Sequence, residues 1–140
     1  MDPTLKDGRR PKLLSLDHFG TRILPSLFIL KKMMERISEE RGPETVVEPW
    51  QVFDLIGGVG GGGIVAIMLG RLQMSLVECI ARFHSFSTSL RQPSPGKPAI
   101  VDMDALGKAV KDISLEIDGK TMLMDGSQQS CKVYVSSLLP

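Results

Sequence analysis

The residues with the clearest chemical potential form a glycine cluster in the middle of the chain. Positions 57–63 read Gly-Gly-Val-Gly-Gly-Gly-Gly, between a predicted strand at 52–56 and a predicted helix at 64–69. Glycines allow close approach of the backbone, and amides at a helix N-terminus favour anions. Three kinds of site use this geometry: a phosphate loop, a dinucleotide-binding turn and a nucleophile elbow.

The first two kinds of site fit the cluster poorly. A phosphate loop of the Walker type needs Lys and Ser/Thr where this chain has Ile64 and Val65. The segment 58–63 fits the pattern G-x-G-x-x-G, but in a run so rich in glycine the match is nearly automatic. The acidic residue expected about 20 positions later would be Glu78, inside a predicted helix. An anion- or nucleotide-binding α/β module using the Gly57–Gly63 loop remains the alternative interpretation.

The third kind of site, the elbow G-x-S-x-G, has the same strand-turn-helix context. Gly58 and Gly62 supply its flanking glycines, and Gly60 stands where the nucleophilic serine would be. The sequence therefore predicts an elbow at Gly60 whose serine is lost.

Few other residues are candidates for catalysis. A single histidine is more often a surface residue than a base, so His18 and His84 receive no role, and Cys79 is predicted to lie in the core. Asp118 and Asp125 each precede a glycine and indicate turns. We expect no metal site and no cofactor.

Alternating strands and helices predict an α/β domain with a mainly parallel sheet. The expected elements are a strand at 12–16, a helix at 24–40, a loop at 43–51, a strand at 52–56, helices at 64–69, 75–90 and 102–115, and a strand at 131–135. The polar segment 1–11 is expected to be a flexible arm, and 12–140 a single domain.

Composition limits the class of protein. The chain has 140 residues, of which 42% are hydrophobic, with a net charge of +1. This excludes global disorder and gives no reason to expect a nucleic-acid partner. The longest uncharged stretch, 55–70, holds too many glycines for a spanning helix. Two widely separated cysteines indicate free thiols. We expect a cytoplasmic protein that is at most peripheral at membranes.

Beyond these patterns, the chain resembles the patatin-like phospholipases, particularly the fungal-type domain. In that family the elbow segment reads approximately F-D-L-I-G-G-T-S-T-G-G-L-I-A-I-M-L-G-R-L, against residues 53–72 here. The family's L-L-S-L-D-G-G-G-x-R-G corresponds to residues 13–23, and its C-K-V-F-V strand to 131–135. The resemblance extends over about residues 12–135 and implies the N-terminal part of a three-layer α/β/α domain.

The resemblance implies lipid acyl hydrolase ancestry, with a Ser-Asp dyad and an oxyanion hole built from backbone amides. Gly20, Thr21, Arg22 and Gly61 occupy the oxyanion-hole positions, and Gly60 the nucleophile position. A glycine has no side chain, so it cannot form an acyl-enzyme.

Other departures affect the first loop and the dyad. His18, Phe19 and Ile23 stand where the family pattern has glycine, which predicts a misshapen oxyanion hole. The family's catalytic Asp follows the C-K-V-F-V strand, and this chain ends five residues after Val135. We therefore expect a truncated domain and a pseudoenzyme that binds a lipid or acyl ester, or a partner. The sheet would keep an exposed edge that a second copy or another protein completes.

Overall fold

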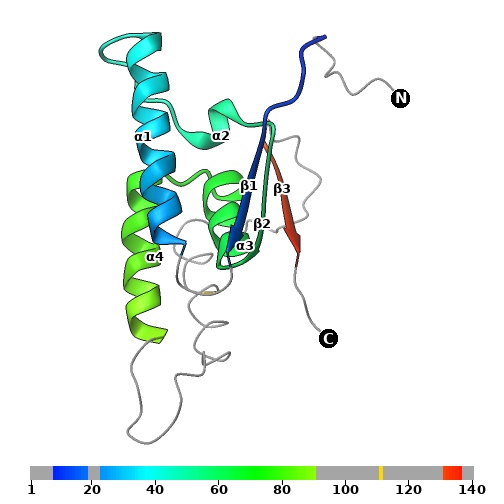
Figure 1. The fold of residues 1–140 in the computed structure, drawn as a ribbon, viewed down its shortest axis with the longest axis vertical. Coiled ribbons are helices and arrows are strands. Elements are labelled where there is room, and N and C mark those ends of the chain that lie inside the picture. The colour runs from blue at the N-terminus through cyan, green and yellow to red at the C-terminus, as the bar shows by residue number, and fades with distance from the viewer. Residues whose placement is uncertain (1–7, 19–22, 91–110, 112–130, 137–140) are drawn as a thin grey trace, which may run out of the picture.

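A computed structural model describes residues 8–18, 23–90, 111 and 131–136. Three strands, β1 (Leu13–His18), β2 (Leu55–Gly60) and β3 (Lys132–Ser136), form a sheet in the order β1-β2-β3, with both pairs parallel (Figure 1). The expectation of an α/β fold with a parallel sheet is confirmed.

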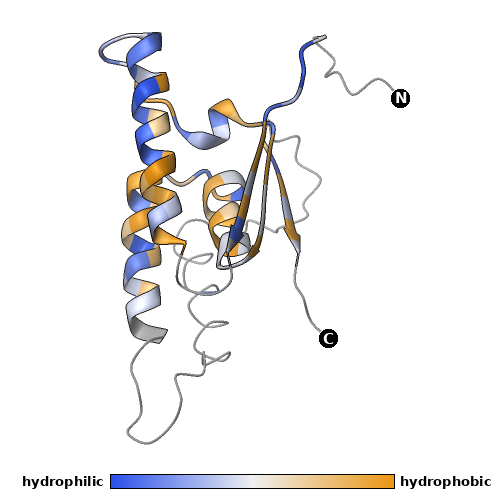
Figure 2. Cartoon of the chain, in the orientation of Figure 1, coloured by the Kyte–Doolittle hydropathy of each residue, from blue (hydrophilic) through white to orange (hydrophobic). Residues whose placement is uncertain are grey.

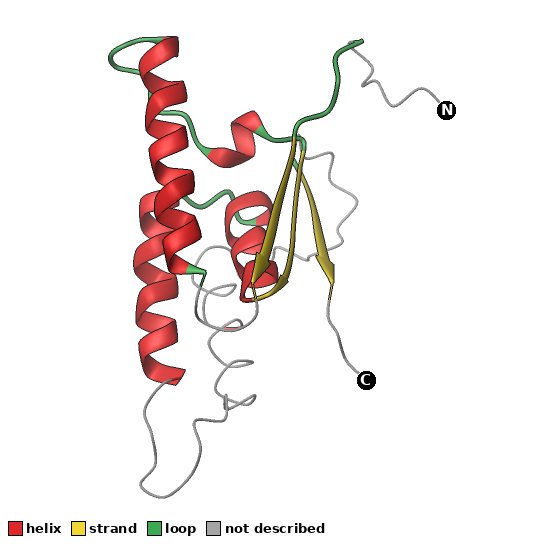
Figure 3. Cartoon of the chain, viewed as in Figure 1, coloured by secondary structure: helices red, strands yellow, loops and turns green. Residues whose placement is uncertain are grey.

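The helices of the described residues lie on one side of this sheet. They are α1 (Leu24–Arg41), α2 (Pro49–Val52), α3 (Gly61–Ala66), a π-helical turn η1 (Ile67–Arg71) and α4 (Leu76–Leu90). Of these, α3 and η1 contact the strands directly. In Figure 3, α1 and α4 lie side by side, and α3 stands between them and the strands.

The core lies between the sheet and these helices. Leu16 and Ile56 point into it from adjacent strands, and Val133 of β3 packs against it. Successive strand residues alternate between the two faces of a sheet, so Leu13 and Tyr134 lie on the opposite face. Each of these two side chains is 63% exposed. Figure 2 shows apolar residues along both the strands and the helices that face them.

The first predicted helix is confirmed almost residue for residue. The spacing of three and four predicts an apolar face of Leu27, Leu30, Met33, Met34 and Ile37. Leu27, Leu30 and Met34 are buried and Ile37 packs against the core, but Met33 is 50% exposed, so its place on that face is wrong. The helix ends at Gly42, whose φ of 141° is rarely adopted by other residues, and Pro43 follows.

The expected loop at 43–51 and strand at 52–56 are partly wrong. A short helix, α2, forms because Pro49 occupies its first turn and Glu48 and Gln51 make a reciprocal capping box. The second strand then begins at Leu55 and continues through Gly60, so the first half of the glycine cluster is strand rather than loop.

The compact helix expected at 64–69 begins earlier and ends later. It starts at Gly61 and continues as η1, where the Leu72 N–H donates to the Ile67 carbonyl at 3.0 Å. The predicted helix stops at Leu69, before Gly70. Instead Gly70 is buried, and a Cβ there would collide with Val133 of β3. A glycine at this position allows the helix to pack closely on β3.

The predicted helix starting at Ser75 and the predicted strand at 131–135 are confirmed within one residue. Ser75 Oγ accepts the Glu78 N–H at 3.2 Å, but the Glu78 carboxylate turns to Arg82 instead of completing a capping box. A carboxylate oxygen of Glu48 accepts the Leu76 N–H at 2.9 Å and caps α4 from the loop. The helix predicted at 102–115 lies outside the described residues except for position 111.

Candidate functional site at the turn between β2 and α3

The turn between β2 and α3 lies at the carboxyl ends of the three parallel strands. Gly60 ends β2 in register with His18 of β1, and its neighbour Val59 is in register with Ser136 of β3. In open parallel sheets, ligands bind outside the carboxyl ends of the strands. The glycine cluster is therefore at the edge where an α/β protein places its chemistry.

Gly60 has the backbone of a sharp strand-to-helix turn. Its φ of 59° and ψ of −125° lie in a region that residues with a Cβ rarely adopt, and it is exposed to solvent. A nucleophile elbow holds its serine on such a strained turn between strand and helix. Gly60 thus has the backbone conformation of such a turn and no side chain that could attack an ester.

Gly58 and Gly62 are required by sterics rather than by dihedral angles. A Cβ on Gly58 would lie 2.7 Å from Gly63 N and closer still to the Gly62 carbonyl. A Cβ on Gly62 would lie 2.7 Å from the carbonyl carbon of Leu16, and closer still to its oxygen. The elbow thus depends on contact with Leu16 of β1, a residue that sequence reasoning did not single out because its role is carried by a backbone atom.

The predicted oxyanion-hole residues are only partly described. Gly61 is buried and is the first residue of α3, so its N–H has no acceptor within the helix. Gly20, Thr21 and Arg22 lie outside the described residues, as does Phe19. The structure therefore brings Gly61 to the turn and leaves the contribution of the first loop as a prediction.

The structure also bears on the anion-binding alternative. Gly57–Gly60 belong to β2, which pairs with a strand on each side. Amides that serve a sheet ladder cannot also surround a phosphate. Only the first amides of α3, from Gly61 onward, remain for that purpose, so the expected Gly57–Gly63 loop is replaced by strand and helix.

The other reactive side chains lie away from this edge or are inert. Cys79 is buried in α4, and burial raises the pKa of its thiol to about 12. Burial likewise raises the pKa of the Cys131 thiol to about 11. Thiols with such pKa values are not nucleophiles near neutral pH. The prediction that Cys79 is a core residue is confirmed.

The remaining candidates receive no new role. His84 is exposed on α4, and His18 ends β1 instead of lying in a loop. Asp118 and Asp125 lie outside the described residues. Within the described part of the chain, no three His, Cys, Asp or Glu side chains gather closely enough to hold a metal ion.

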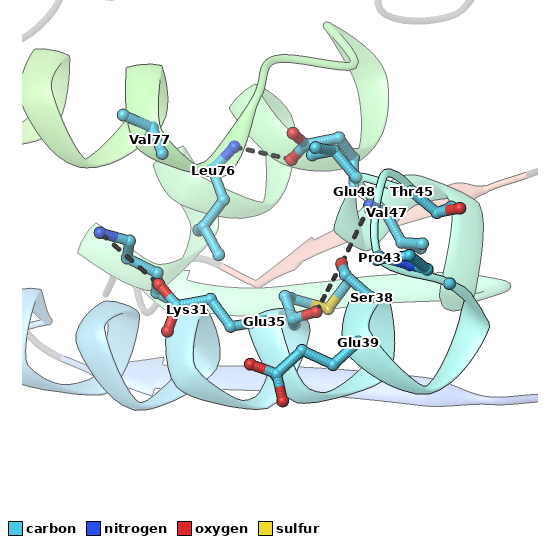
Figure 4. Close-up of a pocket in the computed structure, with 13 residues that line it drawn as sticks. Lys31, Glu35, Ser38, Glu39, Pro43, Thr45, Val47, Glu48, Leu76 and Val77 are labelled. Carbon is cyan, nitrogen blue, oxygen red and sulfur yellow. Dashed lines mark hydrogen bonds and ion pairs between the residues drawn. The ribbon is translucent and has the colours of Figure 1, made fainter.

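A groove of about 330 Å³ opens elsewhere, between α1, the 42–48 loop and the start of α4 (Figure 4). Met34, Val47 and Leu76 line its apolar part, and Gly60 is not among its lining residues. Ser38 donates to the Met34 carbonyl at 2.8 Å and accepts the Val47 N–H at 3.1 Å. These bonds tie the loop to α1 and fix one wall of the groove.

Comparison with known proteins finds a partial similarity to one class of protein, the patatin-domain phospholipases. Over 72 residues the chain is 40% identical to human calcium-independent phospholipase A2-gamma, and 39% identical to the same protein from Mus musculus. The rabbit protein, from Oryctolagus cuniculus, is 32% identical over 83 residues. The resemblance to the patatin-like phospholipases is confirmed as a partial similarity to a patatin-domain phospholipase.

The similarity covers a small part of these relatives. The human match includes 51% of this chain and 8% of that protein, and the rabbit match 59% and 10%. No protein-family profile matches the chain, and no solved structure matches it. In the described residues, no helix combines the length and apolarity needed to cross a bilayer.

Proposed function

We propose that this chain is a non-hydrolysing relative of the patatin-like phospholipases that binds acyl lipids at the carboxyl edge of its sheet. The observation that supports the proposal is the turn at Gly60, with its φ of 59°, its exposure and its lack of a side chain. Losing the nucleophile of a serine hydrolase lowers kcat by about 10⁶-fold, which leaves binding as the retained property.

The apolar residues around the turn suit an acyl chain. Val135 is 44% exposed on β3, and its Cγ1 lies against the start of α3, where a Cβ on Gly63 would be 2.7 Å away. Leu16 of β1 and Gly58 of β2 are in register with Val135 on the same face of the sheet. Apolar side chains at an edge with free helix amides would suit the two ends of a fatty acid.

The test of the missing chemistry is labelling with a fluorophosphonate, with hydrolysis of a short-chain nitrophenyl ester measured in parallel. We expect neither labelling nor turnover from a sample that circular dichroism shows to be folded. Labelling with turnover would mean that another serine has taken over the role, and the proposal would be wrong.

The test of binding is a titration with a fluorescent fatty acid below its micelle concentration. We expect Val135→Asp to weaken binding at least tenfold, because it puts a charge where the acyl chain would lie. The matched control is Val46→Asp, an equally drastic change at a side chain that is 79% exposed in the 42–48 loop. No binding by the unmodified chain would refute this half of the proposal.

The anion- or nucleotide-binding alternative stays a separate candidate with its own test. Its remaining support is the run of amides at the start of α3, from Gly61 to Gly63. Calorimetric titration with NAD, ATP and phosphate would detect it, and the absence of heat at millimolar ligand would exclude it.

A further inference from the structure

The groove between α1, the 42–48 loop and the start of α4 has an apolar floor (Figure 4). Met34 of α1, Val47 of the loop and Leu76 of α4 form this floor, and all three side chains are buried. The volume of about 330 Å³ lies at the lower end of the ~300–1,000 Å³ that is typical of small-molecule sites. The groove is therefore large enough for a small apolar group.

Hydrogen bonds hold the walls of the groove in place. Ser38 joins α1 to the loop, as described above. The carboxylate of Glu48 joins the loop to α4 through the Leu76 N–H. The Thr45 N–H closes the loop by donating to the Gly42 carbonyl at 3.2 Å. A site whose walls are fixed before binding loses little conformational entropy when a ligand enters.

Exposed apolar side chains stand on both sides of the groove. Val46 of the loop is 79% exposed and Val77 of α4 is 64% exposed, and both line the groove. They continue the apolar floor toward solvent, so an alkyl chain in the groove would bury apolar surface on both walls. A protein partner would gain little here, because two side chains offer far less than the ~800 Å² per partner that a stable interface buries.

Carboxylates outnumber cations around the groove. Glu35, Glu39 and Glu48 are among its lining residues. Lys31 is the one cation among the described residues that line it, and Glu35 already pairs with it at 3.8 Å. Glu39 is exposed, and Glu48 is bonded to backbone amides. Within the described part of the chain, neither of these two carboxylates has a cationic partner.

We infer that this groove binds a small organic cation, a primary ammonium group on an alkyl chain. The alkyl chain lies on Met34, Leu76 and Val77. The ammonium group faces the carboxylates of Glu39 and Glu48, to which it offers three N–H donors and a compact positive charge. A fatty acid fits the groove poorly, because its carboxylate would meet like charges. The inference is independent of the proposed acyl-lipid site, since it concerns other residues and a ligand of opposite charge.

The experiment is an NMR titration of the full ¹⁵N-labelled chain with octylammonium below its micelle concentration. We expect saturable shifts of the amide signals of Ser38, Val47 and Leu76, and weaker binding as salt is added. Octanoate has a chain of similar length and the opposite charge. It should bind at these residues at least about fivefold more weakly, because it makes no ion pair with the carboxylates.

Two pairs of variants separate the charge from the apolar surface. Glu39→Gln should weaken octylammonium binding about threefold, because it removes one exposed carboxylate. Glu40→Gln, at the next position of α1 and outside the groove lining, should leave binding unchanged. Val77→Lys should weaken binding about tenfold, because it adds a cation and removes apolar surface. Ile29→Lys is its matched control, since Ile29 is also 64% exposed and lies outside the groove lining.

The inference is overturned if octylammonium causes no saturable shifts at the groove, or if octanoate binds there as tightly. It is also overturned if Glu40→Gln or Ile29→Lys weakens binding as much as the groove variants, all of them shown to be folded by circular dichroism. A dimer that Val77→Lys converts to a monomer would equally overturn it, since the groove would then be an interface between copies.

Discussion

The glycines of the turn are needed for different physical reasons. Gly58 and Gly62 leave no room for a Cβ, because neighbouring backbone atoms stand where it would be. Gly60 instead adopts a φ of 59°, which a residue with a side chain can adopt at the expense of strain. A serine at that position is therefore compatible with the fold, whereas an alanine two residues later is not.

The first prediction compares these two positions. Gly60→Ala should lower the free energy of unfolding by about 1–3 kcal/mol, the usual strain of such a backbone. Gly62→Ala should cost more than about 3 kcal/mol, because the Leu16 carbonyl belongs to a central packing contact and cannot move away. Urea denaturation followed by circular dichroism measures both. Equal losses would contradict the distinction between strain and collision.

For these residues, the sequence predicts the position of the turn but not the contacts that require its glycines. The order of glycines in 57–63 predicts a sharp turn at Gly60, and the φ of 59° observed there agrees with it. It does not reveal that Gly62 meets Leu16 or that Gly63 meets Val135, because those contacts join α3 to strands far away in the chain. The role of Gly20, Thr21 and Arg22 in an oxyanion hole also stays a prediction.

At the scale of elements, one carboxylate joins the beginnings of β1 and β2. Asp54 accepts two bonds from the Arg9 guanidinium, at 2.7 and 2.9 Å, and one from the Lys12 N–H at 2.8 Å. These bonds hold Arg9 and Lys12 against the residue that precedes β2. The hydrogen bonds from Arg9, followed by that from Lys12, hold the pKa of Asp54 below its ordinary value of 3.8.

The second prediction follows from that lowered pKa. A carboxyl group with a lower pKa in the folded state stabilises the fold above its unfolded pKa, and this stability is lost as pH falls through the folded value. Asp54→Asn should therefore cost about 1 kcal/mol at pH 7, a modest figure because Arg9 is half exposed. The difference between variant and unmodified chain should shrink below pH 3.8. A difference that is constant from pH 7 to pH 3 would contradict the ionic origin.

The third prediction concerns the start of α4. Ser75→Ala should cost about 1 kcal/mol, because it removes the hydroxyl that accepts the Glu78 N–H. Thr88→Ala in the same helix should be neutral or slightly stabilising. Its hydroxyl only donates back to the His84 carbonyl, and alanine favours helix. Thermal unfolding of both variants measures these changes in stability. An equal loss of stability in the two variants would argue against a capping role for Ser75.

Helix boundaries show how far local signals extend. The limits of α1 follow from its apolar spacing and from Gly42-Pro43, both of which act within a few residues. The helical segment that continues from α3 into η1 does not stop at Gly70 but runs on to Arg71. Packing against β3 outweighs the intrinsic tendency of glycine to end a helix. The cap that Glu48 provides to Leu76 is likewise invisible in sequence, since 28 positions separate them.

For the whole molecule, the alternation of strand and helix patterns in the sequence predicts a parallel sheet. It does not predict which faces of the sheet the helices cover. Parallel sheets are normally covered on both faces. In the described residues the helices contact the face of Leu16 and Ile56, and the face of Leu13 and Tyr134 stays exposed. We propose that another chain, a second copy or a partner, shields this face.

The last prediction tests a second copy on that face. We expect analytical ultracentrifugation to show a mass that rises with concentration, because the exposed Leu13 and Tyr134 side chains on an open sheet face favour association. Leu13→Lys with Tyr134→Lys should return the chain to a monomer, since four added charges would be buried in a symmetric pair. Val46→Lys, a lysine at an exposed apolar position of the 42–48 loop, should leave the association unchanged. A monomer at every concentration would mean that residues outside the described ranges or a different protein cover the face, and pull-down with the unmodified chain and the double variant would then separate those two cases.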